Sequence, residues 1–219
     1  MIYLSTQAVV LKREEKAERD LDIVFFTKDF GKLKVLAKGA RSINAKLSPH
    51  LQELNLANLE LVLKVQFRLI GAEVENSFSF LKANPKATFL ALRAVNLFDE
   101  VVVLSEKDLA LWGWLVSFLK VFDLLSKKKV KDYFFDLGDV FFKLKLLEIL
   151  GYMPGWEELL KEKNFSALQK KILMLLTREK KFSNISKIFS KKEFSLKEKK
   201  ELESLNKKIT KIFKSVVPY

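Results

Sequence analysis

The first eighty residues alternate between short apolar runs and charged or turn-forming segments, a pattern typical of β-strands. The runs are rich in β-branched and aromatic side chains, and Leu33 and Val35 alternate with Lys32 and Lys34. Gly31 ends a tight turn, so we expect a positive φ angle there. The pattern predicts five strands, at residues 6–11, 21–27, 32–37, 54–63 and 67–75.

A long loop at residues 38–48 separates the third predicted strand from the fourth, and it lacks apolar periodicity. Closing five short strands into a barrel leaves no free strand edge. We therefore expect residues 1–80 to form a five-stranded OB-fold barrel.

After Phe80 the apolar residues recur every three or four positions, as they do in helices. Pro85 marks an early helical position, and Gly151 with Pro154 marks a helix end. The pattern predicts helices from about residue 85, at 107–125, from 132 or 139 to 150, at 168–176 and at 196–213, the last with weak caps. The predicted fold class is α+β, with an N-terminal barrel at 1–80 and an all-helical domain at 81–219.

The chain has 219 residues, is 49% hydrophobic and carries a net charge of +13. A chain of this size buries a sizeable core, and its charge favours an acidic partner, either nucleic acid or an anionic membrane. The excess is uneven, because residues 161–219 hold 17 basic and 6 acidic side chains, a net charge of +11. A second, smaller basic zone lies at residues 28–46.

The composition argues against most catalytic chemistry. The chain has no cysteine and one histidine, His50, which excludes thiolate zinc sites and a zinc-protease helix motif. The glycines form neither a phosphate loop nor a dinucleotide fingerprint, and the carboxylate pairs are more typical of solvated helix surface. We expect no enzyme activity, no cofactor and no metal.

Membrane insertion is not expected either. The longest charge-free apolar stretch considered, Leu109–Leu119, is much shorter than the roughly twenty residues of a spanning helix. The first charges, Lys12 and Arg13, follow the N-terminal apolar run rather than precede it, the reverse of a signal peptide. We expect a cytoplasmic protein.

The N-terminal basic zone predicts a nucleic-acid surface, because cations on one strand and the following loop lie on one side of a barrel and can hold phosphates. OB-folds pair such a groove with aromatic side chains on which bases stack, and Phe30 in the turn is the best placed to do so. The predicted DNA-binding residues are Lys32, Lys34, Lys38, Arg41, Lys46 and Phe30.

Several motifs resemble the RecO family of DNA-repair proteins. They are the strand around Thr6–Lys12, the segment Thr27–Leu33, the Ala37–Arg41 stretch and the helical segment Lys145–Pro154. The resemblance covers roughly residues 1–155. Many relatives carry a four-cysteine zinc module after the last motif, whereas residues 155–164 contain no cysteine.

The resemblance implies a recombination mediator that binds single- and double-stranded DNA and anneals complementary strands. It also implies binding to the acidic C-terminal tail of single-stranded-DNA-binding protein and, with RecR, loading of RecA. An apolar groove rimmed by lysines would suit such a tail. The resemblance places this groove in the helical domain, with Tyr133, Phe142, Lys143, Lys145 and Leu146 as its candidate residues.

Three alternatives remain at this stage. A basic OB barrel could bind RNA or the ribosome, and the basic C-terminal helix could lie on an anionic membrane surface. A hydrolase or nuclease is opposed by the lack of a histidine or carboxylate cluster.

Overall fold

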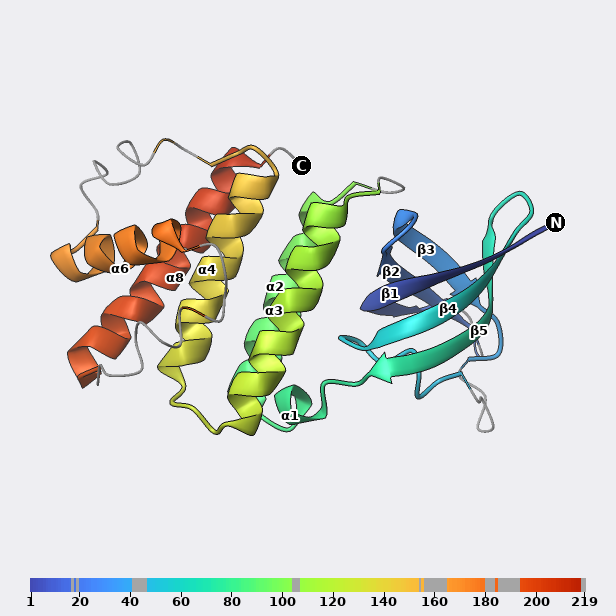
Figure 1. Ribbon diagram of the computed structural model, residues 1–219, viewed down its shortest axis with the longest axis horizontal. Helices are drawn as coiled ribbons and strands as arrows, with labels where there is room; N and C mark the ends of the chain where they lie inside the picture. The colour runs from blue at the N-terminus through green and yellow to red at the C-terminus, as the bar shows by residue number, and fades with distance from the viewer. Residues whose placement is uncertain are drawn as a thin grey trace. The chain divides into compact units, whose positions relative to one another are not determined.

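The N-terminal residues form a closed five-stranded barrel in the computed structural model, which describes residues 1–16, 18, 20–40, 47–103, 107–153, 155, 165–179, 184 and 194–217 (Figure 1). Its strands are β1 (Ile2–Glu15), β2 (Leu21–Thr27), β3 (Gly31–Ala37), β4 (Leu56–Leu63) and β5 (Phe67–Asn76). The order around the barrel is β1-β2-β3-β5-β4. The predicted OB-fold barrel is confirmed.

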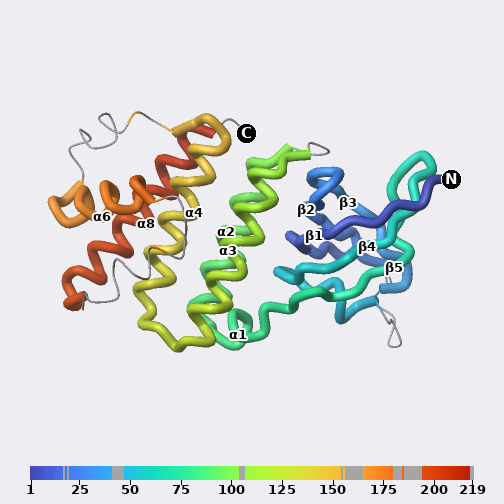
Figure 2. Tube along the Cα trace, viewed as in Figure 1, coloured from blue at the N-terminus to red at the C-terminus, as the bar shows by residue number. Residues whose placement is uncertain are grey.

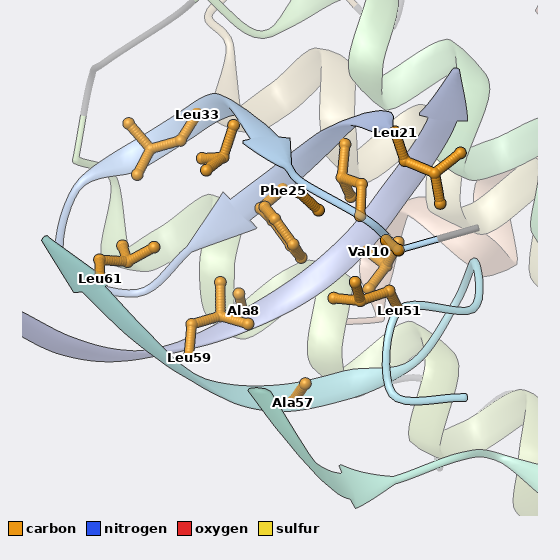
Figure 3. Close-up of a cluster of buried hydrophobic side chains, with 13 residues drawn as sticks. Ala8, Val10, Leu21, Phe25, Leu33, Leu51, Ala57, Leu59 and Leu61 are labelled. Atoms are coloured by element: carbon orange, nitrogen blue, oxygen red, sulfur yellow. The ribbon is translucent and has the colours of Figure 1, made fainter. Parts of the chain in front are cut away.

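The long strand β1 joins two sides of the barrel. Its first half pairs antiparallel with β4, with Ile2 opposite Leu63, and its second half pairs with β2. The barrel closes where β3 runs parallel to β5, with Leu36 opposite Arg68. Alternate side chains of these strands point inward and form a buried apolar cluster with Leu51 from the turn before β4. Figure 3 shows this cluster, with labels on Ala8, Val10, Leu21, Phe25, Leu33, Leu51, Ala57, Leu59 and Leu61.

The turn before β3 fixes the direction of that strand. Gly31 has a φ angle of +66°, as predicted from the turn. The Thr27 hydroxyl donates to the Gly31 carbonyl oxygen at 2.8 Å and accepts from the Phe30 backbone N–H at 3.0 Å. Because both backbone groups are held, β3 starts in a defined register with Lys32 and Lys34 on its outer face.

The rest of the described chain is helical. The helices are α1 (Ser79–Lys82), α2 (Pro85–Val101), α3 (Leu109–Lys127), α4 (Tyr133–Ile149), α6 (Ala167–Arg178) and α8 (Leu196–Val216). Asn84 caps α2 by accepting from the Ala87 backbone N–H, and Asp108 does the same for α3. The positive φ of Gly151 follows the end of α4, as the sequence predicts.

The last two helices both begin with a well-formed cap. Ser166 with Gln169 and Ser195 with Glu198 form capping boxes at the starts of α6 and α8. In each box the serine oxygen accepts from the third backbone N–H while the longer side chain reaches back to the serine N–H. The expectation of weak caps for the last helix was therefore wrong. In the sequence each box is visible as a serine followed three residues later by glutamine or glutamate.

The chain divides into two compact units. One consists of Met1–Ser79 with Val95–Val116, and the other of Phe80–Ala94 with Ser117–Tyr219. The predicted division into residues 1–80 and 81–219 stays a prediction, and the units differ from it because parts of α2 and α3 group with the barrel. Within the first unit, the ring of Phe98 in α2 packs edge-on against Phe26 of β2 at 4.9 Å.

Helix α4 forms the centre of the second unit, and α6 and α8 pack on it (Figure 2). Nearly every residue of α4 is buried. Aromatic side chains fill the space between α3 and α4, with Phe118 and Phe142 4.4 Å apart and Phe122 and Phe135 5.4 Å apart. Burial on all sides explains why α4 lacks a clear polar face in the sequence.

One described helix, α3, is long and apolar enough to cross a membrane by length and composition alone. Core helices of soluble domains pass the same test. Phe118, Leu119 and Phe122 of α3 are fully buried among other side chains.

Candidate nucleic-acid interface

A groove of about 790 Å³ follows the seam between β3 and β5 on the outside of the barrel. Its walls come from β3, from the first residues of β5 and from the turn between β4 and β5. One acidic residue, Asp22, lies among its lining, together with five cations: Lys16, Lys32, Lys34, Lys38 and Arg68. The groove thus has the excess of positive charge that a phosphate backbone requires.

The alternation of β3 places its lysines on this wall. Leu33 and Val35 are 4% and 1% exposed and belong to the core, whereas Lys34 is exposed on the outer face. Lys38 follows at the end of the strand and is also exposed. The predicted inward and outward sets of β3 are therefore confirmed, and three predicted cations share one groove.

Lys32 is already engaged within its own unit. Its Nζ lies 2.8 Å from Asp99 Oδ1 and donates to the backbone carbonyl oxygens of Asp99 and Val102 at the C-terminal end of α2. Its side chain is only 14% exposed. A lysine at this end of a helix satisfies carbonyls that have no partner in the helix and complements the helix dipole. Lys32 therefore ties the barrel to α2, a role that its strand position did not predict.

Lys34 is accessible but paired. Its Nζ lies 2.7 Å from Glu14 Oε2 and 3.7 Å from Asp22 Oδ2, and its side chain is 48% exposed. Hydrogen bonds from Lys12 and Lys34 lower the pKa of Glu14 to about 2, and the bond to Glu14 raises the pKa of Lys34. A phosphate that binds Lys34 must displace or share these carboxylates.

The other predicted cations differ in what the structure describes. Lys38 is exposed and lines the groove. Arg41 and Lys46 lie outside the described residues. Two cations that the sequence reasoning missed, Lys16 and Arg68, join Lys38 in the groove, and Lys16 Nζ lies 3.1 Å from Asp22 Oδ1.

These two were missed for different reasons. Arg68 sits at an outward position of β5, but only the parallel pairing of β3 with β5 brings it next to Leu36. Lys16 follows a strand predicted to end at residue 11, whereas β1 continues to Glu15 and carries the next residue to the groove. Alternation in β5 was a usable signal for Arg68, and the sequence held no comparable signal for Lys16.

Phe30 does not stand out from the surface as expected for a stacking platform. Its half-buried ring packs against the barrel core, with its centroid 5.6 Å from that of Phe67. The hydrogen bond from the Phe30 N–H to Thr27 holds the turn in this position. Phe67 itself lines the groove but is also half-buried. The geometry therefore favours contacts to phosphates over stacking on these rings.

The proposed tail-binding residues of α4 do not form an open groove. Tyr133, Phe142, Lys143 and Leu146 are 4%, 0%, 1% and 0% exposed. Lys145 is partly accessible, and its Nζ forms an ion pair with Glu148 Oε2 at 2.5 Å. The prediction of a surface groove at these residues needs this correction, because α4 is covered by the helices that pack on it and its aromatic side chains form the core.

Lys143 instead belongs to a buried polar network between α4 and α8. Its Nζ lies 2.8 Å from Asp139 Oδ2 and 2.5 Å from Asn206 Oδ1, and the Asn206 amide donates to Asp139 Oδ2 at 2.7 Å. Burial lowers the pKa of Lys143, an effect that the charge of Asp139 opposes. Asp136 lies three residues before Asp139 on α4 and is also buried. Burial raises the pKa of the Asp136 carboxyl, and the hydrogen bond and charge of Lys86 oppose this increase. The network is a structural element of the helical unit.

No group of three or more histidine, cysteine, aspartate or glutamate side chains that could hold a metal ion occurs among the residues that the structure describes.

The fold and the groove define a class of protein in which a basic OB barrel precedes a helical region. Residues 1–78 match the family model described as "Recombination protein O N terminal". The protein from Thermodesulfovibrio yellowstonii named DNA repair protein RecO is 25% identical over 158 residues, which cover 71% of this chain and 60% of that protein. The protein of the same name from Caldanaerobacter subterraneus is 28% identical over 155 residues, with coverages of 70% and 60%. The chain is thus similar to RecO proteins over 155 to 158 residues, and its residues 1–78 match the model of the family's N-terminal region.

The matched part covers neither this chain nor the relatives completely. The chain spans about 60% of the length of these relatives, and a third, from Syntrophus aciditrophicus, is 27% identical over 155 residues and is covered to 56%.

Proposed function

We propose that this protein is a non-enzymatic DNA-binding recombination mediator that acts in DNA repair. The observation that carries the proposal is the groove between β3 and β5, where Lys16, Lys34, Lys38 and Arg68 converge on the outside of an OB barrel. The names of the relatives, all DNA repair protein RecO, support the same role. The ligands are single- and double-stranded DNA, bound through the phosphate backbone.

Strand annealing follows from charge neutralisation. Two complementary strands repel each other through their phosphates, and a protein that holds both lowers this repulsion and releases condensed counterions. A groove without fully exposed aromatic rings in its described lining suits this task, because it holds the backbone and leaves the bases free to pair.

The partners of this proposal are RecR, the acidic C-terminal tail of single-stranded-DNA-binding protein and, indirectly, RecA loaded onto DNA covered by that protein. The protein would act in the cytoplasm, at the nucleoid. Because the α4 residues first considered for the tail are buried, the tail must bind elsewhere on the basic surface or open the helical unit.

The experiment that tests the function is a titration of labelled single-stranded DNA and of duplex DNA with the full chain at increasing salt. Electrostatic binding predicts a linear fall of the logarithm of the affinity with the logarithm of the salt concentration. Binding that does not change with salt would contradict the phosphate-backbone account. Competition with structured RNA separates DNA from RNA ligands, and metal-dependent cleavage of the DNA would contradict a non-enzymatic role.

A membrane-surface role is opposed by the position of α8. An interfacial helix inserts its apolar face into the lipid. In α8 this face is occupied, since Leu202, Leu205, Ile209 and Phe213 are each 0% exposed within the helical unit.

A further inference from the structure

Helix α8 has two sharply different faces. One face, made by Leu202, Leu205, Ile209 and Phe213, is fully buried in the helical unit. The other face carries exposed lysines. Four of them form what we call the α8 lysine stripe: Lys200, Lys207, Lys211 and Lys214.

The spacing of the stripe is regular for a helix. Steps of seven, four and three residues bring the four lysines to one side of a helix with 3.6 residues per turn, opposite the buried face. From Lys200 to Lys214 the stripe is about 21 Å long at 1.5 Å per residue. That length matches about six phosphates of one DNA strand at 3.4 Å per step.

The charges of the stripe are uncompensated. None of its four lysines makes an ion pair with any residue that the structure describes. Two of the three acidic residues of α8 are occupied elsewhere: Glu198 in the capping box with Ser195, and Glu201 as acceptor from the Ser166 hydroxyl. The third, Glu203, is exposed three residues after Lys200 and four before Lys207, so it reduces the net charge of this side of the helix from four to three.

Three of the five cations of the barrel groove are in the opposite state, whereas Lys38 and Arg68 make no ion pair with any residue that the structure describes. Lys32 is bound to Asp99, Lys34 to Glu14 and Asp22, and Lys16 to Asp22. A phosphate that enters the groove must compete with carboxylates, whereas a phosphate at the stripe replaces only mobile counterions, whose release favours binding.

We propose that the α8 lysine stripe is the principal contact for the nucleic-acid backbone and that the barrel groove is the weaker of two separate phosphate-binding surfaces. This inference rests on the proposed DNA binding, and it specifies which of the two surfaces contributes more to the affinity for DNA. A phosphate polymer fits better than a lipid surface, because the apolar face of α8 that a bilayer would need is buried.

The test compares three variants of the full chain, each with four cations neutralised to glutamine. The first changes the stripe (K200Q, K207Q, K211Q, K214Q) and the second changes the groove (K16Q, K34Q, K38Q, R68Q). The third is a charge-matched control at exposed lysines of α3 and the turn after it (K120Q, K127Q, K128Q, K129Q). The groove variant leaves Asp22 without its lysines and Glu14 with Lys12 alone, so any bias in the comparison works against the inference.

We expect the stripe variant to bind labelled duplex DNA at least about tenfold more weakly than the wild type, with a salt slope smaller by about 3 to 4. The groove variant should lose less, and the control should stay within about threefold of the wild type. A groove variant that loses more than the stripe variant would overturn the inference but leave DNA binding intact. A wild type that does not bind DNA would overturn the proposed function as well.

Footprinting of the wild type removes any dependence on the folding of the variants. Amine acetylation read by mass spectrometry should show that duplex DNA protects Lys200, Lys207, Lys211 and Lys214 more than Lys34 and Lys38. Equal or reversed protection would contradict the proposal. Vesicles of anionic phospholipid should not protect the stripe, and stronger protection by vesicles than by DNA would identify a membrane surface and overturn it.

Discussion

Lys32 Nζ lies 2.8 Å from Asp99 Oδ1 and joins strand β3 of the barrel to the C-terminal end of α2 within one compact unit. The same nitrogen donates to the backbone carbonyl oxygens of Asp99 and Val102, which no longer have partners within the helix. Lys32, at an outward position of β3, thus stabilises the packing of the barrel on α2, whereas the neighbouring Lys34 and Lys38 remain exposed.

Replacing Lys32 with alanine should therefore affect stability more than binding. The change leaves the partly buried Asp99 carboxylate unpaired, and we expect a loss of about 1–3 kcal/mol in the free energy of unfolding. Urea denaturation measures this loss, and a DNA titration in parallel should show an affinity close to that of the wild type. Lys38→Ala is the control, with unchanged stability and weaker binding. The reverse pattern in the two variants would contradict the architectural role of Lys32.

Glu14 should act as an internal competitor of phosphate. Its carboxylate bridges Lys12 and Lys34, at 2.7 Å from each Nζ. Glu14→Gln frees both lysines, so we expect DNA affinity to rise about two- to fivefold at low salt and the salt slope to steepen by up to about 1. Glu73→Gln, an exposed change on β5 outside the groove, adds the same net charge and is the control. An equal gain in both variants would mean that net charge, and not the bridge, is responsible.

The same bridge predicts a pH dependence of stability. Because the pKa of Glu14 is lowered from 4.5 to about 2 by hydrogen bonds from Lys12 and Lys34, its contribution is present above pH 4.5 and disappears as the pH falls to about 2. The free energy of unfolding of the wild type should therefore fall more steeply over this window than that of Glu14→Gln. Solvent screens the exposed pair, so the difference will be small. Parallel pH profiles for the two proteins would refute the shift.

Charge reversal in the barrel region tests the site residues predicted from the sequence. We expect Lys34→Glu, Lys38→Glu and Arg41→Glu together to weaken DNA binding more than the same changes at Lys127, Lys128 and Lys129, because the first set includes Lys34 and Lys38, which line the groove. Filter binding or anisotropy at one salt concentration is sufficient. Equal losses in the two variants would remove the barrel from the DNA-binding surface.

Lys143 should be essential for the helical unit. Lys143→Met leaves Asp139 buried without its cation, and breaking such a pair costs about 3–5 kcal/mol of unfolding free energy. The double variant Asp139→Leu with Lys143→Met should recover part of this loss, since no isolated charge remains. Lys145→Met on the same helix is the control, because Glu148 is mostly exposed and the pair contributes at most about 1 kcal/mol. Denaturant midpoints that are alike for Lys143→Met and Lys145→Met would contradict the buried network.

The alternation of apolar and polar residues was sufficient to predict the barrel strands and most helices. In β3 the core residues Leu33 and Val35 differ from Lys32 and Lys34 by one position each, and the structure confirms both sets. The distant partners of a side chain, by contrast, cannot be predicted from the residues next to it in the sequence. Nothing near Lys32 in the sequence indicates Asp99, which lies 67 positions away. The carboxylate that neutralises Lys143 is Asp139, four residues earlier on the same helix, but nothing near Lys143 indicates Asn206, which lies 63 positions away.

For this protein the sequence alone determined the α+β class, the five-stranded barrel, the outward face of β3 and the concentration of positive charge at the C-terminus, since each depends on local periodicity or on a count. The tertiary structure alone decided which cations are available. Burial placed Tyr133, Phe142, Lys143 and Leu146 in the core, and ion pairs occupied Lys32 and restrained Lys34, while Lys200, Lys207, Lys211 and Lys214 remained uncompensated among the described residues. The physical reason is that a charge becomes a binding site only when it is exposed and unpaired, and both properties depend on neighbours that are distant in the chain.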